Sequence, residues 1–196
     1  MWLAWTGVRL TGVRVEIEGR DRFDPNLTYI YMCNHTSNLD PPIVVPVIPR
    51  RTSVLVKKEL FQVPLLGRAM RLGDLVPVDR ANRDAAIASV ERGAEVMRKG
   101  LNMTVFPEGT RSRDGKLLPF KKGPFYLAME TGFPVIPMTI VGTHELWPKG
   151  RFSIKVGVAT VVFHEPIDPK QFTERDALMD AVRAKIESAL PEQYRS

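Results

Sequence analysis

The chain has 196 residues, enough for one domain with a sizeable core, and its 44% hydrophobic and 26% charged residues are ordinary for a soluble globular fold. Its one cysteine, Cys33, excludes an internal disulfide and suits a reducing compartment. No uninterrupted apolar run reaches the ~18 residues that a membrane-spanning helix needs, and nothing resembles a cleavable signal peptide. Lys and Arg outnumber Asp and Glu by 28 to 22, so the charge of +6 favours anionic partners: phosphorylated substrates, anionic lipid surfaces or nucleic acid.

The N-terminal residues 1–12 combine two tryptophans, Trp2 and Trp5, with apolar side chains and Arg9. Such a mixture is typical of a short segment that lies in a membrane interface. A frayed terminus, or one that packs on the core, is the alternative, and the sequence does not choose between them.

Hydrophobic patterns predict alternating strands and helices along the rest of the chain. The expected strands cover residues 13–18, 29–33, 52–56, 75–78, 102–106 and 135–141, with one or two more within 154–163. Helical segments are expected to begin at 57–60 and to cover 61–72 (broken at Pro64), 84–99, 123–132 and a C-terminal stretch of about 173–190. We therefore expect an α/β domain that covers residues 1–196 without repeats or linkers.

Residues 34–40, N-H-T-S-N-L-D, place a histidine and a carboxylate five positions apart, behind a strand and ahead of two prolines that favour a first helical turn. Five positions do not share a helical face, so His35 and Asp40 can meet only if the chain bends at the serine and asparagine between them. Asp40 could then accept a hydrogen bond from one ring nitrogen and leave the other free to take up a proton. The alternative is a surface histidine in a polar turn beside a carboxylate that caps a helix.

Residues 106–112, F-P-E-G-T-R-S, follow another predicted strand. Gly109 lets the backbone approach a ligand closely, and Arg111 can bind two phosphate oxygens in a fork. Lys121, Lys122 and the start of the next helix add positive potential. The pattern is neither G-x-x-x-x-G-K-[ST] nor G-x-G-x-x-G, so nucleotide hydrolysis and dinucleotide binding both lose support.

Together these blocks resemble the 1-acylglycerol-3-phosphate (lysophosphatidate) acyltransferases, a branch of the membrane glycerolipid acyltransferases. The resemblance spans residues 13–141 and rests on N-H-x-x-x-x-D at 34–40, an aspartate–arginine pair at 79–80, F-P-E-G-T-R-S at 106–112 and a V-I-P stretch at 135–137. Two features depart from the family: Pro77 stands where phenylalanine is usual, and the hydrophobic N-terminal region is short. The resemblance implies a single-domain α/β fold whose central mixed sheet is flanked by helices.

The resemblance also implies the chemistry and its residues. His35 would be the general base, oriented by Asp40, and would activate the free hydroxyl of the lysolipid to attack the thioester of acyl-CoA or of acyl carrier protein. No acyl-enzyme, cofactor or metal is expected. Six positions match residues of the family tied to the acceptor, the first and last of them to its phosphate: Lys57, Arg80, Glu108, Gly109, Thr110 and Arg111.

Several of these residues have a structural alternative. Lys57 could be a solvated surface cation, Arg80 could pair with Asp79 or Glu108, and Glu108 could hold the turn or Arg111. Cys33, two residues before His35, suggests a thiol nucleophile, but buried cysteines are common. His144 and His164 lack a motif partner and show no metal-ligand spacing, so we expect structural or surface roles for them.

The expected product is phosphatidate, made by a peripheral or monotopic protein on the cytoplasmic face of the cell membrane. Its expected partners are a lysophospholipid, an acyl thioester and an anionic membrane surface, with acyl carrier protein as an alternative donor and no nucleic acid. Two alternatives remain open: an acyltransferase for another lysolipid such as lyso-ornithine lipid, and a basic, non-enzymatic membrane-binding module. The apolar and basic residues of segment 61–72 suit a bilayer surface, and buried packing is their alternative.

Overall fold

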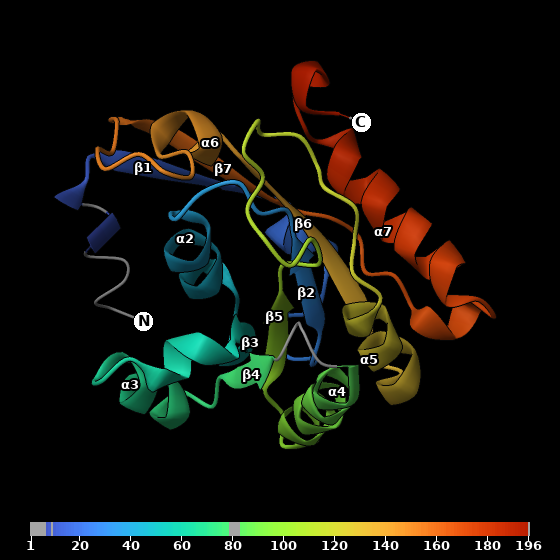
Figure 1. The fold of residues 1–196 in the computed structure, drawn as a ribbon. Coiled ribbons are helices and arrows are strands. Elements are labelled where there is room, and N and C mark those ends of the chain that lie inside the picture. Colours follow the sequence, from blue (N-terminus) through green and yellow to red (C-terminus); the bar gives the residue numbers. More distant parts are fainter. Residues whose placement is uncertain (1–6, 9, 79–82, 196) are drawn as a thin grey trace.

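The computed structural model describes residues 7, 8, 10–78 and 83–195 (Figure 1). Its strands are β1 (Val13–Glu18), β2 (Ile30–Cys33), β3 (Thr52–Lys57), β4 (Val76–Val78), β5 (Asn102–Val105), β6 (Val135–Val141) and β7 (Gly157–Phe163). Its helices include α2 (Asp40–Val47), α3 (Leu66–Leu72), α4 (Arg83–Arg98), α5 (Gly123–Thr131), α6 (Thr143–Leu146) and α7 (Arg175–Ser188). No helix within these described ranges is long and apolar enough to cross a bilayer.

The strands form one sheet in the order β1-β7-β6-β2-β5-β3-β4. Neighbouring strands run parallel except β6 and β7, which are antiparallel. The predicted α/β fold with a central mixed sheet and flanking helices is therefore confirmed.

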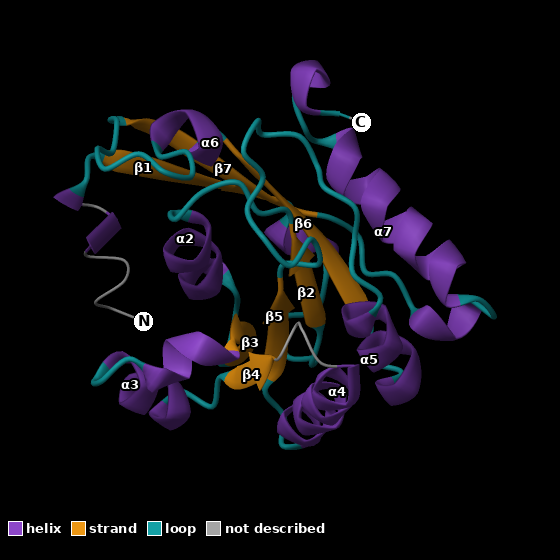
Figure 2. Ribbon diagram, in the orientation of Figure 1, coloured by secondary structure: helices purple, strands orange, loops and turns teal. Residues whose placement is uncertain are grey.

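Helices cover both faces of the sheet (Figure 2). All four residues of β2 are buried, and they alternate between two apolar clusters. Tyr31 and Cys33 pack with α2 on one face, whereas Ile30 and Met32 pack with α4, α5 and α7 on the other. This continuous apolar run is what a strand of a doubly covered parallel sheet requires.

The predicted elements agree with the structure apart from their ends. The segment that contains Pro64 is broken as predicted, into a 3₁₀ turn at Lys58–Gln62 and helix α3. The last strand begins at Gly157 rather than at Ile154, and the C-terminal helix begins at Arg175 rather than at Thr173. Most of the predicted interfacial segment, residues 1–6 and 9, lies outside the described residues.

The parallel strands β2, β3, β4 and β5 bring their carboxyl ends to one edge of the sheet. In open α/β sheets this edge is where ligands bind. The three described segments that carry the predicted site residues all start there: residues 34–40 after β2, Lys57 at the end of β3, and residues 106–112 after β5. Arg80, which follows β4, lies outside the described residues, as does Asp79.

Candidate active site

His35 and Asp40 meet at the carboxyl end of β2. Nδ1 of His35 lies 2.8 Å from Oδ2 of Asp40, so the predicted bend and contact are confirmed. The same carboxylate oxygen accepts hydrogen bonds from the backbone N–H groups of Thr36 and Ser37, each at 2.7 Å. Because a carboxylate can only accept, Nδ1 carries the hydrogen and Nε2 is the nitrogen that can take up a proton.

The bend between them is fixed by Ser37. Its hydroxyl oxygen accepts from the Leu39 N–H at 3.0 Å, and its O–H donates to the Trp147 carbonyl at 2.6 Å. Ser37 also forms an antiparallel bridge with Pro148, in the segment after α6. The turn is therefore held from outside by a segment more than a hundred residues away in the sequence.

The segment after β5 contacts the ring, the backbone N–H and the backbone carbonyl of His35. The ring of Phe106 stacks on the imidazole, with 4.3 Å between ring centroids and 28° between planes. The His35 N–H donates to Oε1 of Glu108 at 2.6 Å, and the His35 carbonyl accepts from the Ser112 N–H at 2.8 Å. The F-P-E-G-T-R-S block thus fixes the backbone and the ring of the histidine, which leaves 16% of its side chain exposed.

Glu108 is buried, and its second oxygen, Oε2, accepts from the Leu118 N–H at 2.9 Å. Burial raises the pKa of the Glu108 carboxyl to about 8, although both hydrogen bonds from backbone N–H groups oppose the rise. With both oxygens turned to backbone donors, Glu108 supports the structural alternative, although it holds His35 and Leu118 rather than Arg111.

The cationic side chains approach the same turn. The Arg111 guanidinium donates to the side-chain carbonyl of Asn38, between His35 and Asp40 in sequence. Lys149 lies with its ammonium 3.5 Å from the hydroxyl of Thr110. Gly109 has φ +71°, a conformation that favours glycine and lets the chain turn sharply after β5. The structure therefore brings Gly109, Thr110 and Arg111 to the His35 turn.

Lys57 lies farther from His35. Tyr31 and Val54 both align with Thr104 of β5, so Lys57 and the residue before His35 are level with each other, with β5 between them. Two strand spacings of ~4.8 Å place their backbones roughly 10 Å apart. Lys57 is exposed, and its ammonium is 3.4 Å from Glu59.

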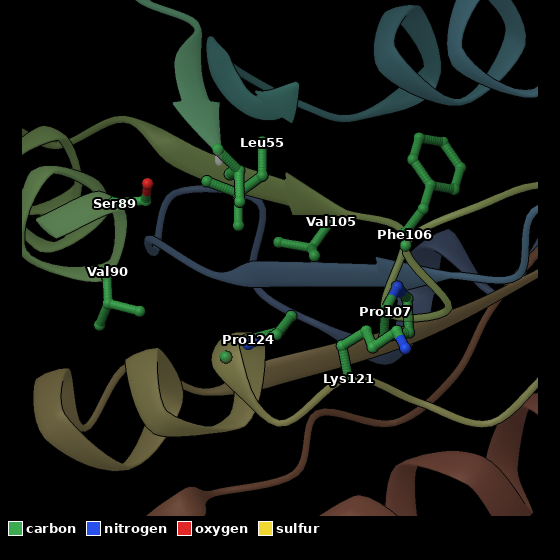
Figure 3. Close-up of a pocket in the computed structure, with 11 residues that line it drawn as sticks. Leu55, Ser89, Val90, Val105, Phe106, Pro107, Lys121 and Pro124 are labelled. Carbon is green, nitrogen blue, oxygen red and sulfur yellow. The ribbon is translucent and has the colours of Figure 1, made fainter. Parts of the chain in front are cut away.

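An apolar pocket of about 230 Å³ lies at the end of β5 (Figure 3). Leu55, Val90, Val105 and Pro124 line it, and Lys121 also contributes to the lining. The Phe106 ring points away from the pocket in Figure 3 and packs with the apolar cluster of the opposite sheet face. The residue whose ring stacks on His35, Phe106, is thus also one of the residues that line the pocket.

Several contributors, among them Phe106, Ser112 and Lys149, were not predicted as site residues. Phe106 and Ser112 belong to a block whose role in holding the histidine could have been suspected from the sequence. Lys149 follows no motif, and only the fold brings it to Thr110.

Two of the remaining candidate residues, Cys33 and His164, are buried in the protein core. Cys33 is fully buried, and burial raises the pKa of its thiol well above the usual value, which opposes a thiolate nucleophile. His164 is buried, its Nε2 lies 2.9 Å from the Thr139 hydroxyl, and burial lowers its pKa to about 4. Within the described residues no group of three His, Cys, Asp or Glu side chains could hold a metal ion.

The structure thus places a histidine against a buried carboxylate, beside a turn that cationic side chains approach. A family model described as Acyltransferase matches residues 14–141. The chain belongs to this acyltransferase family.

Similar proteins support this membership. The 1-acyl-sn-glycerol-3-phosphate acyltransferase of Cocos nucifera is 35% identical over 189 residues, which are 95% of this chain and 61% of the relative. That of Limnanthes douglasii is 39% identical over 163 residues, 83% of this chain and 57% of the relative. The chain thus spans about three fifths of the length of these curated relatives.

A solved structure is also similar. The crystal structure of the 1-acyl-sn-glycerophosphate acyltransferase of Thermotoga maritima has a TM-score of 0.82 and 32% identity, and the match covers 93% of this chain and 73% of that chain.

Proposed function

We propose that the protein transfers an acyl chain from an acyl thioester to the free hydroxyl of 1-acylglycerol-3-phosphate and forms phosphatidate. The observation that carries the proposal is the shared turn: Asn38, which accepts from Arg111, lies between His35 and Asp40. A base and a phosphate-binding cation that meet at one turn suit an acceptor that bears a hydroxyl and a phosphate. The curated relatives above carry the name of this activity.

In the proposed reaction, Nε2 of His35 removes the proton of the acceptor hydroxyl as its oxygen attacks the thioester carbonyl. The carbon–sulfur bond then breaks, and the thiol leaves with the proton from the imidazolium, so the enzyme returns to its starting state. The Asp40 carboxylate stabilises the imidazolium between these two steps. General-base catalysis of this kind typically contributes ~10²–10⁴-fold to the rate.

Five residues would bind the lysolipid acceptor. Arg111 can hold two of its phosphate oxygens, and the others that we propose are Lys57, Arg80, Gly109 and Thr110. The pocket at the end of β5 suits an acyl chain, because its lining is mainly apolar. Its volume of about 230 Å³ is below the ~300–1,000 Å³ of typical ligand sites, so it would take part of an acyl chain rather than a whole lipid.

We propose that the protein is peripheral or monotopic on the cytoplasmic face of the cell membrane. The lysophosphatidate acceptor and the phosphatidate product would both lie in that membrane. No cofactor is proposed: the donor, acyl-CoA or acyl carrier protein, is a substrate.

The test is a thiol-release assay with purified protein. Acyl-CoA and acyl carrier protein would be offered as donors, and lysophosphatidate, lyso-ornithine lipid and lysophosphatidylcholine as acceptors. We expect the parent protein to form phosphatidate. The His35→Ala variant should fold but form none. If only lyso-ornithine lipid is acylated, that lipid and not lysophosphatidate is the acceptor. Salt-sensitive lipid binding without any thiol release would favour a non-enzymatic binding module.

A further inference from the structure

The loop between β5 and α5, residues 106–122 (the β5–α5 loop), binds both backbone polar groups of His35. Glu108 accepts from its N–H at 2.6 Å, and the Ser112 N–H donates to its carbonyl at 2.8 Å. The loop is closed at its base by the Lys121 N–H, which donates to the Pro107 carbonyl at 2.8 Å. Where this loop lies therefore determines where His35 lies.

The β5–α5 loop is in turn fastened to the C-terminal helix α7, beside which it passes in Figure 1. The Arg183 guanidinium donates to the carbonyls of Leu118 and Leu117 at 3.1 and 3.2 Å. It also lies over the ring of Phe120, 5.4 Å from its centroid, and forms an ion pair with Glu187 at 3.1 Å. Arg183 thus holds three residues of the loop at once.

Leu118 is the residue at which the two sets of contacts meet. Its carbonyl is held by Arg183, and its N–H donates to Glu108 at 2.9 Å. The contacts run without interruption from Arg183 through Leu118 and Glu108 to the N–H of His35. A second C-terminal contact supports the loop: Gly115 has φ +84°, and a Cβ there would lie 2.5 Å from the ring of Tyr194.

We propose that Arg183 is a positioning residue for the catalytic histidine, acting through Leu118 and Glu108 on the backbone of His35. It lies outside residues 14–141, which the family model matches, so the C-terminal helix supplies part of the site's framework. A general base must be held within hydrogen-bond reach of its substrate, and a displacement of about 1 Å costs ~10²-fold in rate. A small shift of the β5–α5 loop is therefore sufficient to slow catalysis.

The kinetic test compares Arg183→Ala with Arg175→Ala. Arg175 is the matched control, because it lies on the same helix and its guanidinium covers an aromatic ring, that of Tyr126 at 4.7 Å, without touching the loop. We expect Arg183→Ala to lower kcat about tenfold or more while KM for lysophosphatidate changes by less than about twofold. Arg183→Lys should recover part of kcat, since an ammonium can also donate to carbonyls, and Arg175→Ala should match the parent protein.

A double-variant comparison separates positioning from a general loss of order. If Arg183 acts through Glu108, then Arg183→Ala added to Glu108→Gln should lower kcat by no more than about twofold beyond Glu108→Gln alone. Effects that multiply, or a kcat for folded Arg183→Ala within twofold of the parent, would overturn the proposal. If Arg183→Ala does not fold, Arg183→Lys replaces it in the same comparison.

These kinetics rest on the proposed acyl transfer, so a second measurement is independent of it. In protein labelled with ¹⁵N-histidine, which has three histidines, the amide signal of His35 reports its hydrogen bond to Glu108. We expect Arg183→Ala to move this signal and Arg175→Ala to leave it in place. If no lysolipid is acylated, the proposed function fails, and an unmoved His35 amide would then reject the positioning role by itself.

Discussion

Oδ2 of Asp40 lies 2.8 Å from Nδ1 of His35, whereas Oδ1 of the same carboxylate is buried without a hydrogen-bond partner among the described residues. Oδ2 thus accepts three hydrogen bonds: one from the His35 ring and two from the backbone N–H groups of Thr36 and Ser37. Such concentration of donors holds the imidazole in one tautomer and keeps a negative charge close to it.

The first prediction concerns this charge. Asp40→Asn keeps an oxygen for the two backbone donors but removes the charge that stabilises the imidazolium, so kcat should fall by ~10²–10⁴-fold with KM nearly unchanged. Steady-state thiol release measures this. Asp168→Asn is the control, because Asp168 also accepts from a backbone N–H, that of Lys170, but caps a 3₁₀ turn away from the site. A variant with normal kcat would remove Asp40 from the mechanism.

The second prediction concerns the acceptor phosphate. Arg111→Ala should raise KM for lysophosphatidate by about tenfold to a hundredfold, since a hydrogen bond to a charged group contributes ~1.5–3 kcal/mol. Arg113→Ala changes an exposed arginine two residues along the same loop and should leave KM unaltered. Equal KM values for the two variants would place the phosphate elsewhere.

The His35–Asp40 contact could be predicted from the sequence as one of two alternatives, because the pair is joined by a short bend whose residues favour turning. Strands and helices were also predictable from their apolar patterns, since each pattern is local. The pairing of β1 with β7 was not, because it joins residues about 140 positions apart and depends on the whole sheet.

The sequence could not decide the role of Glu108, because an exposed and a buried carboxylate look alike in a motif. Its partners, His35 and Leu118, depend on the folded conformation of the β5–α5 loop, which the motif does not specify. Arg183 carried no signal at all: it reads as an ordinary cation on an amphipathic helix, and its target lies 65 residues away.

The third prediction concerns pH and stability. The pKa of Glu108 is raised to about 8 in the folded protein, from 4.5 for an unburied carboxyl. Between these two values the folded state binds more protons than the unfolded state, so the contribution of Glu108 to stability is present below pH 4.5 and is lost as pH rises towards 8. The slope for one such group is at most ~1.4 kcal/mol per pH unit.

Glu108→Gln removes this titration. Urea unfolding of both proteins at several pH values from 5 to 9 would measure the difference in their free energies of unfolding. We expect the parent to lose stability relative to the variant up to about pH 8 and to change no further above it. Parallel curves over the whole range would show that Glu108 is ionised in the folded state throughout.

The last prediction concerns the segment from the 3₁₀ turn to the end of α3, residues 58–72. It exposes large apolar side chains next to basic ones: Leu65 and Leu72 are 86% and 77% exposed, and Arg68 and Arg71 lie between them. Gly67 is the buried residue of α3, and a Cβ there would lie 2.0 Å from the Phe61 carbonyl oxygen, so the helix packs closely on the turn. An apolar and basic surface of this kind suits an anionic bilayer.

We therefore expect the protein to float with anionic vesicles at low salt, and Leu65→Glu with Leu72→Glu to reduce the bound fraction several-fold. Added salt should weaken binding only in part, because screening acts on the arginines and not on the leucines. Leu27→Glu is the matched control: Leu27 is 53% exposed, in the loop before β2, and the same charge there should leave flotation unchanged. Flotation that the double variant retains in full would assign membrane contact to another part of the chain, and a parent protein that stays with the soluble fraction would contradict the proposed location.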